Sequence, residues 1–185
     1  MLRRLKWIVL LLVVVVVAGA VIAVLTTRPG LSDARDRVDT RWLVLRPSLM
    51  ARYAALTPVE QALVAAGGPD RAVTRDLRDE LARWKALAAR STANADPGAE
   101  ALAANALEAL ARRTRANMTN GKLNGNQALT AALQTFDTKV PQPPDAVSKY
   151  NDAVRAYQEE RSGTVHSAVA SLLGYDERPQ LVVGS

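Results

Sequence analysis

The residue types that most often carry out catalysis are scarce in this chain. Its 185 residues include one histidine and no cysteine, which excludes thiol chemistry, cysteine-based zinc sites and sites that need two imidazoles. The histidine, His166, lies near Ser162 and Ser167 in a segment with helical spacing. A serine nucleophile needs both a base and an orienting acid. Without an evident third group, we interpret His166 as an ordinary residue on a polar helix face.

Acidic residues are numerous, but their spacing favours ion pairing over acid–base chemistry. One predicted helix interleaves both signs of charge along its length, at Arg75, Asp76, Arg78, Asp79, Glu80 and Arg83. Such spacing is typical of a solvated, ion-paired face. Di-iron bundles need Glu-x-x-His repeats, which the sequence lacks, and LNGNQ at 123–127 has no P-loop lysine. We therefore predict no catalytic, cofactor-binding or metal-binding residues and no enzymatic activity.

Arg112, Arg113 and Arg115 form a short basic cluster. They could contact anionic lipid headgroups or an acidic partner, although cations also favour solvated helix C-termini. The whole chain carries 24 basic and 18 acidic residues, a net charge of +6, and only 4% aromatic residues. Few aromatic side chains argue against base-stacking modules, so we expect no nucleic-acid partner.

The N-terminal region predicts a transmembrane anchor. Residues 7–25 form a run of nineteen without a charged side chain. A helix of that length spans about 28 Å, close to the roughly 30 Å of a bilayer core. Arg3, Arg4 and Lys6 precede the run, and Trp7 stands where an interfacial aromatic is favoured. We divide the chain into a basic tail at 1–6, an anchor at 7–27 that contacts the lipid bilayer, and a helical domain at 28–185.

Two alternatives concern this segment. A cleaved signal peptide would explain the small-x-small site at Ala18-Gly19-Ala20, but the apolar run continues to Leu25 and favours an uncleaved anchor. The basic tail favours a cytoplasmic N-terminus. Arg28 and two further arginines soon after the span weaken that asymmetry. We expect a single-pass protein of the cell membrane with its helical domain outside the cytoplasm.

Apolar residues recur at helical spacing through the rest of the chain. Pro47 lies off the first stripe and is expected to kink that helix or to divide it in two. Pro29-Gly30 predicts a joint, and PQPP at 141–144 predicts a break. Narrow stripes of this kind suit coiled-coil-like bundle packing. We predict an all-α fold in which the transmembrane helix is followed by an antiparallel bundle of about four long helices. The predicted stripes are Val38–Leu56, Val73–Ala88, Leu102–Leu110 with Ala103 and Leu107 as further candidates, Leu129–Val140, Val147–Tyr157 and Val165–Leu172.

The C-terminal segment 150–183 resembles the LemA family. Those proteins carry a YN-x-AV-x-x-Y helix, then an apolar-Gly-aromatic element and a charged-Pro tail. This sequence matches at Tyr150-Asn151, Ala153-Val154, Tyr157, Leu172-Leu173-Gly174-Tyr175 and Pro179. The anchor, Val38-Asp39 and the stretch 45–56 are similar too. Thr164-Val165 replaces the usual Phe-Pro pair, and PQPP interrupts what is commonly one helix.

The resemblance implies a bacterial single-pass membrane protein with a long helix bundle and no established enzymatic activity. It also marks an interaction or structural motif at Tyr150, Asn151, Val154, Tyr157, Gly174 and Tyr175. Asn151 lies beside the apolar stripe. It is expected either to satisfy a buried polar group or to line a groove together with the two tyrosines.

Two functions fit these observations. The first is a membrane-tethered, non-enzymatic scaffold or protein-interaction module of the bacterial envelope, with a protein partner or self-association. The alternative is a ligand-sensing domain that binds a small molecule or a cell-wall fragment between its helices. A carboxylate-based hydrolase, the third hypothesis, has no positive support in the sequence.

Overall fold

The computed structural model describes residues 2–67, 71–120 and 123–184, without the side chains of residues 2–6, 8–10, 13, 16, 20 and 120. This part of the chain contains helices and no strand, which confirms the all-α part of the predicted fold class. Its α-helices are α1 (Leu2–Ala54), α2 (Leu56–Gly67), α3 (Ala72–Ala88), α4 (Pro97–Asn120), α5 (Gln127–Thr138), α6 (Ala146–Arg161) and α7 (Thr164–Leu172). A 3-10 helix, η1 (Thr92–Asn94), precedes α4.

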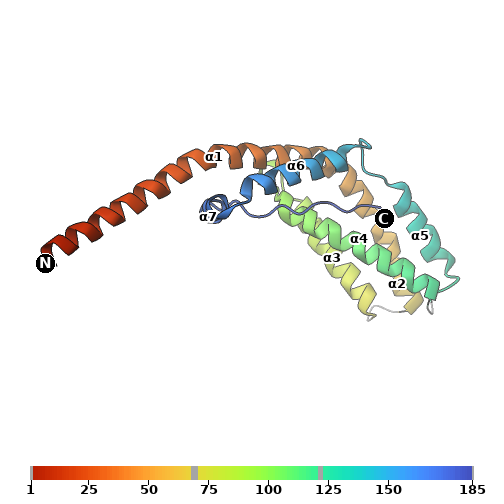
Figure 1. Ribbon diagram of the computed structural model, residues 1–185. Helices are drawn as coiled ribbons and strands as arrows, with labels where there is room; N and C mark the ends of the chain where they lie inside the picture. The colour runs from red at the N-terminus through yellow and green to blue at the C-terminus, as the bar shows by residue number, and fades with distance from the viewer. Residues whose placement is uncertain (1, 68–70, 121–122, 185) are drawn as a thin grey trace.

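The second half of α1 is the central helix of the bundle. Helices α6 and α7 pack against α1, α3 packs against α4, and α5 packs against α2. Figure 1 shows the first half of α1 projecting away from the bundle, and the segment after α7 running back past α4 and α6 towards α5. The helices that follow α1 are shorter than the four long helices that we predicted, because the segments 89–96, 139–145 and 162–163 divide them.

Helix α1 continues without interruption for 53 residues, through both Pro29 and Pro47. The joint predicted at Pro29-Gly30 is therefore wrong, whereas Pro47 lies within the helix as expected. An interior proline removes one hydrogen bond but has a φ angle compatible with a helix. The residues that follow Pro29 are held by packing, since Leu31 and Val38 are completely buried. The boundary expected at 27/28 thus falls inside one helix.

Among the residues that the structure describes, no helix combines the length and apolarity that crossing a membrane requires. The anchor predicted at 7–27 lies within α1 and includes positions 8–10, 13, 16 and 20, whose side chains are outside the described part. Nine large apolar side chains of this segment are more than half exposed: Trp7, Leu11, Leu12, Val14, Val15, Val17, Val21, Ile22 and Leu25.

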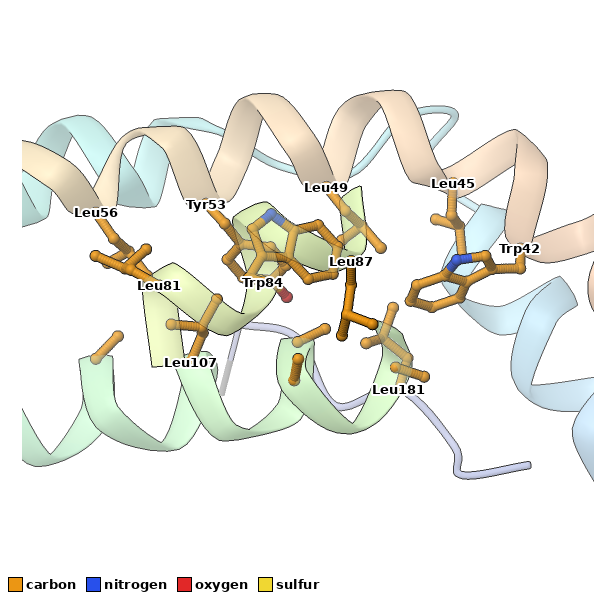
Figure 2. Packing of buried hydrophobic residues seen from close by; sticks show 14 of the residues in the cluster. Trp42, Leu45, Leu49, Tyr53, Leu56, Leu81, Trp84, Leu87, Leu107 and Leu181 are labelled. Carbon is orange, nitrogen blue, oxygen red and sulfur yellow. The ribbon is translucent and has the colours of Figure 1, made fainter. Parts of the chain in front are cut away.

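The core follows the first predicted stripe closely. All six of its residues are fully buried: Val38, Trp42, Leu45, Leu49, Tyr53 and Leu56. The rings of Tyr53 and Trp84 meet edge to face, with centroids 4.8 Å apart. Figure 2 shows the stripe from Trp42 to Leu56 in one cluster with residues from α3 and α4.

The stripe predicted on α4 is wrong in its outer members. Leu102 is more than half exposed, and Ala106 and Leu110 are only partly buried. The further candidates Ala103 and Leu107 are fully buried, and the rest of the buried apolar face of α4 consists of the small residues Ala101, Ala104 and Ala111. Small side chains allow close helix packing, and this face also carries glutamates that find partners on α1. Val140, Val165 and Leu172, at the ends of other predicted stripes, are also exposed.

Two buried ion pairs join α1 to α4. Arg46 Nε lies 3.0 Å from Glu100 Oε2, and Arg52 Nε lies 2.6 Å from Glu108 Oε1. Each guanidinium also donates to backbone carbonyls at the end of a third helix. Arg46 reaches Ala88 and Arg90 after α3, at 3.1 and 2.8 Å, and Arg52 reaches the carbonyl of Lys139 after α5, at 2.8 Å. The last carbonyls of a helix have no partner within it, so each arginine closes one helix end and fixes its position.

Candidate functional site

The candidate site is the contact between the C-terminal segment and the bundle. Residues 176–184, which we call the strap, lie outside regular secondary structure. The strap runs between α4 and α6 (Figure 1). Asp39 of α1 contacts Arg178 in the first half of the strap. We call the residues that hold it the strap groove: Asp39, Asn105, Tyr150, Asn151, Tyr157 and Gln158.

Asn151 on α6 pairs with both backbone hydrogen-bonding groups of Leu181. Its Nδ2 donates to the Leu181 carbonyl at 2.9 Å, and its Oδ1 accepts from the Leu181 N–H at 2.7 Å. A carboxamide offers one acceptor and two donors in one plane. It can therefore pair with one residue of an extended chain as a neighbouring strand would. This contact depends on the backbone of Leu181 and not on its side chain.

Asn105 on α4 makes the corresponding contact from the other edge of the strap. Its Nδ2 donates to the Gln180 carbonyl at 2.7 Å, and its Oδ1 accepts from the Val182 N–H at 2.8 Å. Successive backbone groups of an extended chain point to opposite sides, so one asparagine on each side satisfies both edges. Between them the Leu181 side chain is buried in the core, where Figure 2 shows it in the same cluster as Trp42 and Leu87.

The first half of the strap is held by hydroxyl and amide donors of α6. Tyr150 Oη donates to the Pro179 carbonyl at 2.9 Å, and Tyr157 Oη donates to the Asp176 carbonyl at 2.8 Å. Gln158 Nε2 donates to the Arg178 carbonyl at 3.2 Å. Burial raises the pKa of both tyrosines above the usual value, because it disfavours the phenolate. Both hydroxyls thus remain donors near neutral pH.

The side chain of Arg178 adds a specific anchor. It is 5% exposed, and its Nε and Nη2 lie 3.3 and 3.4 Å from the two carboxylate oxygens of Asp39. A forked contact of this type matches the planar guanidinium to a carboxylate. The guanidinium also lies against Gly98, where a Cβ atom would be 2.9 Å from Nη1. Glycine at the start of α4 therefore leaves room for this arginine.

Gly174 and Tyr175 direct the chain from α7 into the strap. The Tyr175 N–H donates to the Ala170 carbonyl at 2.9 Å, and Gly174 has a φ of +71°. These features form a Schellman cap, in which glycine tolerates the left-handed conformation. Arg35 on α1 secures the cap, since its Nη1 donates to the Gly174 carbonyl at 3.3 Å and its guanidinium lies 5.6 Å from the centre of the Tyr175 ring.

The structure thus brings the predicted motif together. Tyr150, Asn151 and Tyr157 bind the strap, and Gly174 with Tyr175 leads into it. Val154 is fully buried between the two tyrosines on the same face of α6. Asn151 hydrogen-bonds the backbone of Leu181, and a role of this motif in interaction stays a prediction.

The predicted basic cluster is spread over several contacts. Arg113 Nη1 lies 2.9 Å from Asp76 Oδ2 on α3, and Arg115 pairs with Asp137 on α5. Arg112 is half-buried. Two of the three arginines therefore join α4 to different neighbouring helices, and contact of this cluster with lipid or an acidic partner stays a prediction.

Several residues around the groove were missed in the sequence. Asn105 and the buried residues Arg46, Arg52, Glu100 and Glu108 lie far along the chain from their partners. Glu108 Oε2 also lies 3.5 Å from the Gly184 N–H, so this ion pair reaches the end of the strap. Ala103 and Leu107, the further candidates for the α4 stripe, lie on the buried face that carries these glutamates.

A cleft of about 580 Å³ lies beside the last residues of the strap. Polar and apolar groups both line it, among them Arg52, Arg115, Val147 and Val183. No family model matches this chain, and no curated protein or solved structure shows significant similarity to it.

Proposed function

We propose that this chain is a membrane-anchored, non-enzymatic protein-interaction module that binds extended peptide segments in the strap groove. The observation that carries the proposal is the pairing of the strap backbone with Asn105 on one edge and Asn151 on the other. Recognition of this kind draws affinity from main-chain hydrogen bonds and specificity from side-chain pockets. In the free chain the strap is the occupant of the groove.

The strap itself indicates what a ligand must supply. An arginine is paired with Asp39, and a leucine three residues later is buried in the core. Proline is compatible with the position between them, because the groove contacts the Pro179 carbonyl and proline retains that acceptor. The favoured ligand is therefore an extended Arg-x-x-Leu segment, from a partner protein or from a second copy of this chain.

The membrane anchor belongs to the same proposal. It is supported by the uncharged run at 7–25 and by the exposed apolar side chains of the projecting half of α1. We also propose that the chain is a divergent LemA-like protein. In this proposal it lies in the cell membrane, with the bundle outside the cytoplasm. Digestion of a C-terminal tag in intact cells tests the orientation, and protection of the tag until lysis contradicts it.

Peptide binding to a strapless chain tests the groove. A chain ending at Tyr175 is purified in detergent and mixed with a fluorescent peptide of residues 174–185. We expect the fluorescence anisotropy to rise with chain concentration, and Asn151→Ala to abolish that rise. Asn117→Ala is the matched control, since Asn117 is an exposed asparagine of α4. Failure of the peptide to bind a helical, cooperatively unfolding strapless chain contradicts the proposal.

If the strapless chain does not fold, the full chain provides the test, because it has no native cysteine. Copies with Asn105→Cys are mixed with copies carrying Val182→Cys, two positions that are hydrogen-bonded in the groove. A mixed disulfide dimer supports binding of a strap in trans. If a disulfide forms only when both cysteines are on the same chain, the groove accepts only its own strap, and this result contradicts binding in trans.

The alternative function, ligand sensing, is favoured by the cleft at the end of the strap. The cleft is lined by the ion-paired residues Arg115 and Asp137, by Arg52, which is paired with Glu108, and by apolar walls from Pro141, Pro144 and Val147. Such a lining suits a small molecule with both polar and apolar parts. Thermal shift of the full chain against metabolites and cell-wall fragments tests this function, because a ligand of the folded state must raise the melting temperature.

A further inference from the structure

Helix α7 and its flanks form one of the uncharged segments of the helical domain. Residues 162–175 contain no aspartate, glutamate, lysine or arginine, whereas Arg161 precedes them and Asp176 follows. Residues 123–136, around α5, form a second uncharged run of the same length, so what distinguishes α7 is its exposed apolar edge and its packing against α1. A helix without charge can enter a region of low polarity without removing ions from water.

One edge of α7 presents apolar side chains outwards. Leu172 is 77% exposed, which is the largest value among the big hydrophobic side chains of the described residues. Val165 is 55% exposed and lies seven residues earlier, on the same side of the helix. Leu173 adds a third, partly exposed apolar side chain at the end of the helix. The adjacent face, with Val169 and Ala170, is buried in the core.

The position of α7 along α1 places this edge beside the end of the apolar run. Helix α7 packs against α1 at the end of the bundle from which the first half of α1 projects (Figure 1). Burial of α1 begins there, with Ala23 and Val24 partly buried and Thr27 and Leu31 buried. The uncharged run ends at Leu25. Since a helix rises about 1.5 Å per residue, α7 lies within a few turns of the end of that run.

We propose that α7 is an interfacial helix whose apolar edge, formed by Val165, Leu172 and Leu173, rests in the bilayer surface beside the anchor. This inference rests on the proposed membrane anchor. An anchor ending near residue 27 brings α7 to headgroup depth, where apolar side chains gain from leaving water and the absence of charge avoids a desolvation cost. The bilayer thereby fixes the bundle at the level of α7, immediately before the start of the strap.

The absence of native cysteine allows single-site labelling of the full chain. Leu172→Cys reports on the proposed contact, and Val15→Cys reports on the anchor. Val140→Cys is the matched control, because Val140 is similarly exposed, at 58%, in the loop between α5 and α6. Each variant carries an environment-sensitive fluorophore and is reconstituted in vesicles of phosphatidylcholine and phosphatidylglycerol. Some vesicles contain lipid with a nitroxide near the headgroup, and others contain lipid with a nitroxide deep in the acyl chain.

We expect the headgroup nitroxide to quench the Leu172 label several-fold more strongly than the Val140 label. The deep nitroxide should quench the Val15 label most. Quenching at Val15 without quenching at Leu172 overturns the interfacial helix and leaves the anchor in place. No quenching at Val15 overturns the anchor, and the inference with it. The label at position 172 can also show a blue shift that nitroxide does not quench and that disappears on dilution with lipid. That result shows that a second copy of the chain covers α7, and it also overturns the inference.

Discussion

Replacement of Asn151 by alanine should release the strap while leaving the helix bundle folded. The side chain makes two hydrogen bonds to the backbone of Leu181, at 2.9 and 2.7 Å. A net hydrogen bond contributes about 1 kcal/mol to stability. Removal of both should therefore favour the released strap by about 2 kcal/mol, a roughly 30-fold change in its opening equilibrium. The Leu181 side chain is buried and still opposes release.

Amide hydrogen exchange of the full chain measures this change directly. We expect the Leu181 N–H to lose roughly 30-fold of its protection, since its partner is the deleted oxygen. Amides within α6, which are bonded along the helix, should keep their protection. Asn105→Ala removes two equivalent bonds from a more exposed position, so it should have a smaller effect because water replaces the lost partners there. Asn117→Ala should have none.

Three outcomes refute this reasoning. Unchanged protection at Leu181 means that the asparagine does not hold the strap. An equal loss throughout α6 means that the residue supports the whole bundle. A larger effect of Asn105→Ala than of Asn151→Ala means that burial does not set the strength of these bonds.

Three further predictions concern the bundle. Glu108→Ala leaves Arg52 buried without its partner and should destabilise the full chain by about 3–5 kcal/mol in urea unfolding, whereas Glu159→Ala, at an exposed position of α6, should not. Burial raises the pKa of Tyr157. The free energy of unfolding should therefore be constant below the unfolded tyrosine pKa of about 10 and fall as pH rises above it. Urea unfolding at alkaline pH measures this, and a free energy of unfolding that increases with pH contradicts it. Gly163 has a φ of +90°, so its replacement by alanine should lower the free energy of unfolding by about 1–3 kcal/mol. An unchanged melting temperature would show that the turn adapts.

Local spacing was sufficient to predict the helical class and much of the core. The step of three or four residues is a property of the helix backbone, so the stripe from Val38 to Leu56 could be identified from the sequence alone. PQPP at 141–144 and Gly163 likewise mark breaks that depend on local backbone chemistry. The candidate motif at Tyr150, Asn151 and Tyr157 was also found, from its resemblance to a known pattern.

The identity of contacting partners was decided by the tertiary structure. Arg178 and Asp39 are 139 residues apart, and Asn151 pairs with a residue 30 positions later; no local pattern specifies either contact. The same holds for the buried ion pairs, because Glu100 and Glu108 resemble surface residues until the alanines beside them show which face of α4 is interior. Packing after Pro29 likewise kept α1 continuous where the local sequence favoured a joint. Spacing along one helix determines which side is apolar, but only the approach of several helices determines which polar groups lose water and must find partners.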